Sequence, residues 1–336
     1  MKILYGIQAT GNGHITRSIE IIEQLALEPE IERIDVVISG NNADIQLPRD
    51  INYNCKGISF KYGKEGKISY LKSFAKLDLY AFVKSIKSIP FKKYDLVISD
   101  YEPISCWGAK IYNIPCIGIG NIYALTSKNF PRLHGLKLKT NIVTKILCPV
   151  KAKIGMHFTK MDDFIYYPVV RKEIRNATIT NENFILIYLL TYSDEELMKI
   201  LRDKRFDDYK FIIYSKTEKR PNTIKNISIF PLNMESFTMH LTQCAGIITA
   251  GGFQTISEAL YLHKKLLVIP MKGQPEQKAN ASILEKMNVP IAKNPDAASL
   301  LKWLQDDTNN NHIEMKNDID KIIHRIMDIG HALVEN

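Results

Sequence analysis

The chain of 336 residues contains no run of about 18 apolar residues, the length that a helix needs to cross a bilayer. None of its five cysteines is spaced as Cys-x-x-Cys, which argues against a disulfide framework and a zinc knuckle. Glycine and proline have ordinary frequencies, so collagen-like and low-complexity chains are excluded. The first apolar run stops before Gly11, too early for a signal peptide. We expect a globular protein of the reducing cytoplasm.

Short β-rich runs alternate with helical patterns along the chain, which is typical of parallel strands joined by crossover helices. The expected strands cover residues 2–7, 34–38, 96–98, 116–119, 184–190, 211–214, 247–249 and 266–269. Pro168 lies in a seam between the two sets of four strands, where it disfavours helix. We therefore predict two doubly wound α/β domains, residues 1–166 and 167–312, with a C-terminal helix, residues 313–336, packed back on the first.

Basic residues are concentrated in two segments of the first half. Residues 61–93 hold nine lysines against two acids, and residues 128–160 hold eight basic residues and no acid. Aromatic and aliphatic residues are interspersed with them, a mixture suited to anionic lipid head groups. Amphipathic helices with solvated lysine faces would have the same composition, so both interpretations stay open. Nucleic acid is not expected as a partner, because no RNA- or DNA-binding module accompanies the charge.

A glycine-rich turn, Gly11-Asn12-Gly13-His14, joins the first expected strand to a helix. Such a turn lets the backbone at Gly13 approach a ligand closely. A dinucleotide fingerprint would need a third glycine where Thr16 stands and an acid closing the second strand, and the sequence has neither. The turn therefore predicts a ligand site but argues against NAD.

His14 is the first candidate catalytic residue. An imidazole just ahead of a helix can accept a proton from a bound hydroxyl near neutral pH, whereas the alternative role is a polar helix-entry residue. Asp100 and Glu102 follow the buried strand at residues 96–98, and the carboxyl ends of parallel strands collect ligands. We expect Asp100 to orient the imidazole of His14. For Glu102, a helix cap before Pro103 is an equal alternative.

A second glycine turn, Gly251-Gly252, ends the strand at residues 247–249 and opens a helix whose amide groups suit a diphosphate. Glu258 lies about 9 Å along that helix at 1.5 Å per residue, close to the reach from a diphosphate to its ribose. Glu276 and Gln277 begin another helix, where an acid and an amide can bind sugar hydroxyls. Taken singly, Glu258 is also consistent with a solvated helix carboxylate, and the other two with a first helical turn.

The block at residues 249–281 resembles the nucleotide-sugar site of GT-B glycosyltransferases, especially the group with the lipid II-forming N-acetylglucosaminyltransferase of peptidoglycan synthesis and plant-type galactolipid synthases. The His14 turn and the Ser-Asp-Tyr-Glu-Pro element at residues 99–103 are similar to uncharacterised archaeal and bacterial members of that group. The resemblance implies two domains facing across a cleft, with the acceptor on the first and the nucleotide on the second. It assigns Glu258 to the ribose, Glu276 and Gln277 to the donor sugar, and His14 to the base.

One departure from the family concerns the turn after the first strand of the second domain. Relatives carry glycines there, whereas this chain reads Leu-Leu-Thr-Tyr-Ser at residues 189–193. We expect the hydroxyl of Thr191 or Ser193 to hold the diphosphate from that side.

The sequence thus predicts an inverting hexosyltransferase that moves a sugar from a nucleoside diphosphate sugar, a UDP-sugar by resemblance, to a hydroxyl acceptor. No Asp-x-Asp pair stands at a strand end, so we expect neither a metal nor another cofactor. The basic first half favours a lipid-linked acceptor and a peripheral position on the inner face of the cell membrane. The alternatives are a nucleotide-sugar-binding protein without turnover and a nucleotide-sugar epimerase on the same fold.

Overall fold

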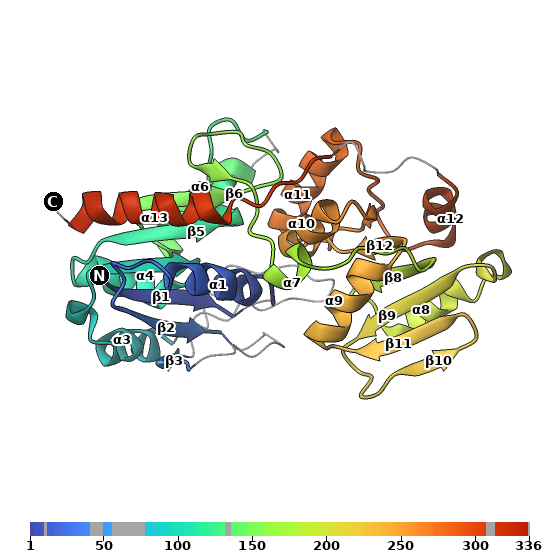
Figure 1. The fold of residues 1–336 in the computed structure, drawn as a ribbon, viewed down its shortest axis with the longest axis horizontal. Coiled ribbons are helices and arrows are strands. Elements are labelled where there is room, and N and C mark those ends of the chain that lie inside the picture. The colour runs from blue at the N-terminus through green and yellow to red at the C-terminus, as the bar shows by residue number, and fades with distance from the viewer. Residues whose placement is uncertain (10–11, 41–49, 56–77, 132–135, 307–312, 335–336) are drawn as a thin grey trace. The chain divides into compact units, whose positions relative to one another are not determined.

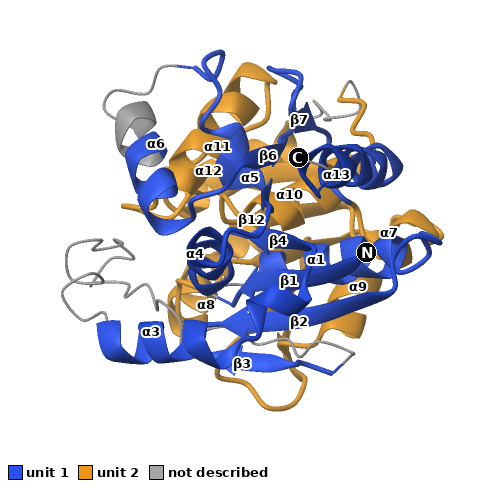
Figure 2. Cartoon of the chain, turned by 90° about the vertical axis from the view of Figure 1, so that its left-hand side faces the viewer, with its two compact units in different colours: residues 1–64, 68–169, 317–336 blue, residues 65–67, 170–316 orange. Residues whose placement is uncertain are grey.

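The computed structural model describes residues 1–9, 12–40, 50–55, 78–131, 136–306 and 313–334 (Figure 1). The described chain forms two compact units (Figure 2). The first runs to Val169 and resumes at Asn317, and the second covers residues 170–316. The unit boundary therefore falls inside the seam around Pro168. Most of the basic segment at residues 61–93 lies outside the described residues.

The first unit is built on a seven-stranded sheet in which all neighbouring strands are parallel. Its order is β3 (Tyr53–Cys55), β2 (Arg33–Ser39), β1 (Lys2–Gln8), β4 (Leu96–Asp100), β5 (Cys116–Gly120), β6 (Ala152–Met156) and β7 (Ile165–Tyr166). The strand order reverses at β1, which pairs with β2 on one side and with β4 on the other. In such sheets the crevice beyond the carboxyl ends at the reversal is the usual ligand position.

The first unit also contains helices. They are α1 (Asn12–Leu25), α3 (Leu79–Ser88), α4 (Pro103–Ile111), α5 (Asn121–Ala124), α6 (Leu136–Leu147) and α13 (Ile319–Val334), with a 3₁₀ turn at Phe91–Lys93. Helix α13 buries Ile322, Ile323 and Ile326 at helical spacing and packs against α1 and β5. Its Gly330 lies where an added Cβ would be 3.2 Å from Leu96. The C-terminal helix is therefore part of the first unit.

The second unit has a six-stranded sheet of order β10 (Asn222–Ile224), β11 (Ile227–Pro231), β9 (Lys210–Ser215), β8 (Phe184–Tyr188), β12 (Gly246–Thr249) and β13 (Lys265–Val268). The order reverses at β8, which pairs with β9 and β12. The edge pair β10–β11 is antiparallel, which corrects the expectation of a purely parallel sheet. A two-residue turn joins these strands, and Lys225 in it adopts a φ of 55°, as tight hairpins require.

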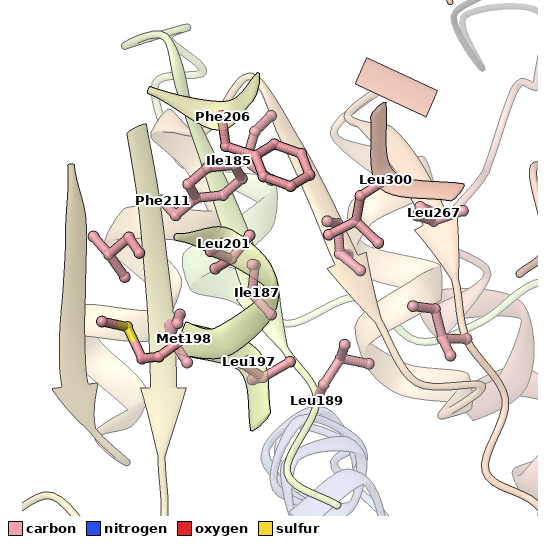
Figure 3. Packing of buried hydrophobic residues seen from close by; sticks show 14 of the residues in the cluster. Ile185, Ile187, Leu189, Leu197, Met198, Leu201, Phe206, Phe211, Leu267 and Leu300 are labelled. Atoms are coloured by element: carbon pink, nitrogen blue, oxygen red, sulfur yellow. The ribbon is translucent and has the colours of Figure 1, made fainter. Parts of the chain in front are cut away.

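The helices of the second unit are α7 (Lys172–Arg175), α8 (Asp194–Leu201), α9 (Met234–Gln243), α10 (Phe253–Tyr261), α11 (Pro275–Lys286) and α12 (Ala297–Gln305), with a 3₁₀ turn at Lys204–Phe206. Of these, α8, α12 and the 3₁₀ turn contribute to a core of branched and aromatic side chains that packs with the strands (Figure 3). Ile185 and Ile187 of β8 pack with Leu197 and Leu201 of α8. This packing holds the carboxyl ends of β8 and β12 in place for the site described below.

All five cysteines are buried free thiols. Among the helices that the structure describes, none has both the length and the apolarity to cross a membrane.

Candidate active site

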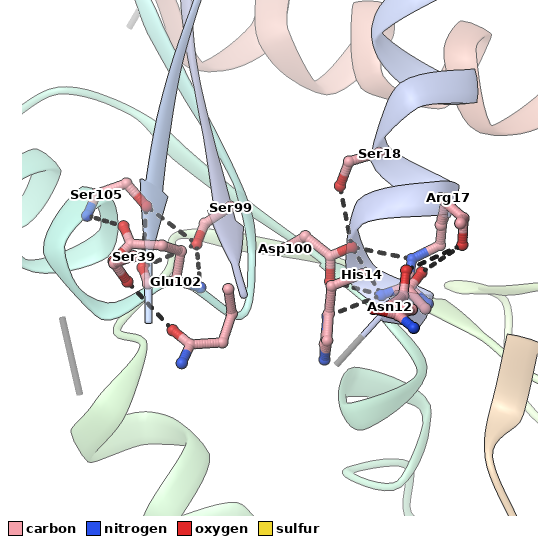
Figure 4. A network of polar contacts seen from close by, with 12 residues as sticks. Asn12, His14, Arg17, Ser18, Ser39, Ser99, Asp100, Glu102 and Ser105 are labelled. Carbon is pink, nitrogen blue, oxygen red and sulfur yellow. Dashed lines mark hydrogen bonds and ion pairs between the residues drawn. The ribbon is translucent and has the colours of Figure 1, made fainter. Parts of the chain in front are cut away.

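His14 and Asp100 meet at the carboxyl ends of β1 and β4. The parallel register pairs Ile7 with Asp100, and the chain leaving β1 enters α1, whose first turn carries His14. The imidazole Nδ1 lies 2.8 Å from Asp100 Oδ1 (Figure 4). Because an ionised carboxylate only accepts hydrogen bonds, Nδ1 is the donor in this contact, and in the neutral ring Nε2, on the far side, is then the acceptor. The predicted pairing of these two residues is therefore present in the structure.

Arg17, one turn further along α1, binds the same carboxylate. Its Nη2 lies 2.6 and 2.7 Å from the two oxygens of Asp100, and its Nε lies 3.0 Å from Oδ2. Burial by itself would raise the pKa of Asp100, but the charges of Arg17 and His14 and their hydrogen bonds outweigh it, so that the pKa is lowered. Asp100 is fully buried, whereas the His14 side chain is 26% exposed and accessible to a substrate.

Glu102 belongs to a separate polar group on the other side of β4 (Figure 4). Its carboxylate accepts hydrogen bonds from the backbone N–H groups of Ile104 and Ser105 and from the hydroxyl of Ser39. Burial raises its pKa to about 7, against the effect of these bonds. Glu102 is the N-cap of α4, so the helix-cap interpretation is confirmed.

The glycine turn of the second unit opens α10, with Gly252 as N-cap and no side-chain cap. The Gly251 N–H is already used, because it donates to Gln277 Oε1 at 3.0 Å. The same oxygen accepts from the backbone N–H of Met271 at 2.9 Å. A Cβ on Gly251 would lie 2.7 Å from the Cβ of Gln277, whereas one on Gly252 would have no atom within 4 Å. Gly251 is thus required by packing against α11, and Gly252 borders open space.

Gln277 therefore supports the glycine turn from α11, and its amide nitrogen contacts the sulfur of Met271 at 3.3 Å. This arrangement was not expected from the sequence, which predicts Gln277 on the donor sugar. Asn280, one turn further on, donates to the carbonyl oxygen of Gly251 at 3.0 Å. Glu276 lies in the first turn of α11 and is half-buried.

Glu258 is 2% exposed in α10, so the interpretation as a solvated helix carboxylate is wrong. Arg171 binds it with two parallel hydrogen bonds, Nε to Oε1 at 2.7 Å and Nη2 to Oε2 at 2.8 Å. Gln254 donates to Oε1 at 3.0 Å, and Thr238 accepts from Arg171 Nη1 at 3.0 Å. These bonds use about three of the four lone-pair positions of the carboxylate. The arrangement fixes the orientation of Glu258 within the second unit.

The two hydroxyls after β8 differ in their contacts. Ser193 is the N-cap of α8 and forms a capping box with Glu196. Thr191 is exposed in the turn before it. Ser193 is exposed too, but its hydroxyl is already bonded to the backbone N–H and the carboxylate of Glu196.

Gly13 lies in the first turn of α1 next to His14, whereas Gly11 lies outside the described residues. No cluster of three His, Cys, Asp or Glu side chains within the described part of the chain could hold a metal ion.

The model of the family described as glycosyl transferase family 1 matches residues 1–306. The chain belongs to this family. A search of curated protein sequences finds no match.

Several solved structures share the fold of this glycosyl transferase family 1 member at low sequence identity. MurG of Acinetobacter baumannii has a TM-score of 0.58 and 13% identity, covering 98% of this chain and all of MurG. The S. aureus MnaA–UDP co-structure has a TM-score of 0.63 and 13% identity, covering 100% and 98%. SsfS6 of Streptomyces sp. SF2575 with thymidine diphosphate has a TM-score of 0.64 and 12% identity, covering 98% and 99%. Both α/β units of this family member thus form a GT-B glycosyltransferase fold, as predicted.

Sequence reasoning missed Arg17 in the first unit and Arg171 in the second. A signal for Arg17 exists, because it follows His14 by three residues and residues at that spacing share a helix face. Arg171 stands in the seam, but nothing local connects it with Glu258, which is 87 positions later.

Proposed function

We propose that this chain is an inverting glycosyltransferase that needs neither metal nor cofactor. It transfers a hexose from a nucleoside diphosphate sugar to a hydroxyl acceptor. The observation that carries this proposal is the fixed His14–Asp100 pair, which leaves Nε2 of an accessible imidazole as proton acceptor. We assign residues 1–166 to the acceptor and residues 167–312 to the donor.

In the proposed reaction the acceptor hydroxyl gives its proton to Nε2 of His14 as its oxygen attacks the anomeric carbon. The bond between that carbon and the diphosphate oxygen breaks, and the diphosphate leaves with the electron pair. Asp100 stabilises the imidazolium that forms. The amino end of α10 at Gly252 offsets the negative charge of the leaving group. Attack opposite the leaving group inverts the configuration of the sugar.

The donor-binding part of this proposal rests on Gly252, Glu258 and Thr191. Gly252 borders open space at the start of a nine-residue helix. Glu258, aligned by Arg171, is assigned to the ribose, and Thr191 and Glu276 to the diphosphate and the sugar. Two GT-B structures of similar fold hold UDP and thymidine diphosphate, which supports a pyrimidine nucleotide here.

Release of nucleoside diphosphate tests the function. Purified protein is incubated with UDP- and dTDP-sugars, with and without membrane extract. A transferase releases diphosphate in an acceptor-dependent way, a binding protein releases none, and an epimerase alters the sugar without any acceptor.

His14→Ala is expected to lower the transfer rate by about 10²- to 10⁴-fold. His324→Ala, on the exposed face of α13, serves as the matched control. An unchanged rate for His14→Ala at saturating acceptor would remove His14 as the base.

We further propose that the first unit binds the anionic inner face of the cell membrane, where a lipid-linked acceptor would lie. Helix α3 exposes Leu79, Tyr80 and Val83, and α6 exposes Ile142 and Ile146. Helix α4 connects the two, because it contacts α3 and its Trp107 indole donates to the Ile146 carbonyl.

Exposed lysines accompany these apolar side chains: Lys84 and Lys87 on α3, and Lys145 on α6. Apolar and basic groups together are what an anionic lipid surface binds. Co-sedimentation with liposomes that contain phosphatidylglycerol is expected and should weaken at high salt. The double charge reversal Lys84→Glu/Lys87→Glu should abolish it, whereas Lys199→Glu on α8 should not. Binding that is absent or insensitive to salt would contradict this assignment.

A further inference from the structure

Arg17 is buried beside His14 and Asp100, the two residues proposed to act as the catalytic base. Its side chain is 4% exposed and Asp100 is fully buried, so water screens little of the interaction between their charges. Both oxygens of Asp100 receive hydrogen bonds from the guanidinium. The hydroxyl of Ser18 lies 3.3 Å from Oδ2 as well. The carboxylate is therefore held in one orientation, with Oδ1 toward His14.

A glycine on the neighbouring strand makes room for this pair. Gly120 ends β5 with a φ of 128°, and a Cβ there would lie 3.0 Å from both Arg17 Nη2 and Asp100 Oδ1. The guanidinium and the carboxylate thus fill the space that a side chain at position 120 would need.

The same guanidinium lies close to the imidazole, with Arg17 Nη2 at 3.2 Å from His14 Nδ1. Nδ1 cannot accept a hydrogen bond there, because its proton points to Asp100. The contact therefore places the positive charge of Arg17 next to the ring.

We propose that Arg17 is a positioning residue for proton transfer: its hydrogen bonds hold the carboxylate of Asp100 aligned so that Nδ1 of His14 bears the proton and Nε2 can accept one. This inference rests on the proposed transferase function. Arg17 acts through the other two residues and is not assigned a contact with substrate.

The pH dependence of the reaction follows from the groups around Asp100. Among the described residues, the titratable side chains facing it are Tyr5 from β1 and His14 and Arg17 from α1. Burial raises the pKa of Tyr5, so this side chain stays neutral. Without the Arg17 charge, burial of Asp100 would favour its protonated form. A protonated Asp100 no longer accepts from Nδ1, so the acid limb of the rate profile should move to higher pH.

Two substitutions separate charge from geometry. Arg17→Gln is expected to lower kcat by about 10- to 100-fold, with little change in the KM for the donor. It should also move the acid limb of the rate profile to higher pH. Arg17→Lys keeps the charge without the paired hydrogen bonds, so it should lower kcat and leave the acid limb in place. Arg205→Gln, which breaks an exposed Arg–Asp pair, is the matched control and should change neither.

A double-mutant cycle distinguishes positioning from a general structural role. In the His14→Ala background, Arg17→Gln should cause no further loss of kcat, because its effect passes through His14. A further loss of the same size as in the wild type would overturn the proposal. Circular dichroism and thermal unfolding establish that each variant is folded.

The tautomer of His14 tests the inference without any enzyme activity. In ¹⁵N-histidine spectra of the full chain at neutral pH, His14 should carry its proton on Nδ1. A proton on Nε2 would overturn the proposal, since Nδ1 would then accept from Arg17 instead of donating to Asp100. If no donor sugar is turned over but His14 shows the Nδ1–H tautomer, the proposed function fails while the arrangement around Arg17 stands.

Discussion

The guanidinium of Arg171 and the carboxylate of Glu258 form a buried pair with two hydrogen bonds, 2.7 and 2.8 Å long, across 87 positions of sequence. The pair ties the first residues of the second unit to the helix that follows the glycine turn. Fork-to-fork geometry of this kind restricts both side chains, so the carboxylate of Glu258 has one fixed orientation.

Breaking this pair should cost considerable stability. Arg171→Met leaves the carboxylate of Glu258 buried without its cation, and we expect the free energy of unfolding to fall by about 3–5 kcal/mol. Urea denaturation followed by circular dichroism measures it. Arg205→Met, which breaks an exposed pair, should change it by less than about 1 kcal/mol. Equal losses of unfolding free energy in the two variants would show that burial does not make the Arg171–Glu258 pair more stabilising than an exposed pair.

The two glycines of the α10 turn should respond differently to alanine. Gly251→Ala brings a Cβ to 2.7 Å from Gln277 and should destabilise the protein by about 1–3 kcal/mol. Gly252→Ala meets no atom within 4 Å and should change stability by less than about 0.5 kcal/mol. If the diphosphate binds there, Gly252→Ala should nevertheless weaken nucleoside diphosphate binding in calorimetry. Unchanged affinity would place the diphosphate elsewhere.

Glu102 should make the fold less stable as the pH rises. Its pKa is raised by burial to about 7 in the folded protein, against about 4.3 for an unperturbed glutamate. Between these values the folded state binds more protons than the unfolded state, so the free energy of unfolding decreases from about pH 4.5 to pH 7. Denaturation curves across this range should show the decrease in the wild type and a flatter profile in Glu102→Gln. An equal slope in both would assign the effect to other groups.

Asp100 should have the opposite dependence. Its pKa is lowered in the folded state, so its contribution to stability is complete above the unfolded value of about 3.9 and is lost as the pH falls through the lower folded value. Comparing acid unfolding of the wild type and Asp100→Asn isolates this contribution. The variant should unfold with less dependence on pH below about 4, and its transfer rate at neutral pH should fall because His14 loses its ionised partner.

Lys264 should be a structural residue of the second unit. Its ammonium group is buried and donates to the carbonyl oxygens of Thr180, Thr242 and Cys244 at 2.7, 2.7 and 2.9 Å. Lys264→Met leaves these acceptors without a donor, and we expect a loss of about 3 kcal/mol in urea denaturation. The exposed Lys199→Met should be neutral. A neutral Lys264→Met would show that water replaces the ammonium group.

Local signals in the sequence were sufficient for eight of the thirteen strands that the structure describes and for several parts of the site. Alternating β-rich and helical segments predicted two α/β units, because each element is specified by periodicity within about ten residues. His14, Gly251 and Gly252 were also recognisable locally, since each stands where a strand turns into a helix. Strands β3, β6, β7, β10 and β11 were missed. Of these, β3, β7 and β10 have only two or three residues, too few to show a period.

The partners of these residues were decided by the tertiary structure. Asp100 lies beside His14 because β4 pairs with β1, and that strand order depends on long-range packing. Arg17, Arg171 and the inward-turned Gln277 find their partners through the same packing, which no nearby sequence specifies. The sequence by itself determined which segments form strands, helices and glycine turns, and which chemical groups stand at their ends. Only the tertiary structure decided which groups meet and which are buried, because hydrogen bonding and desolvation depend on neighbours brought from distant positions.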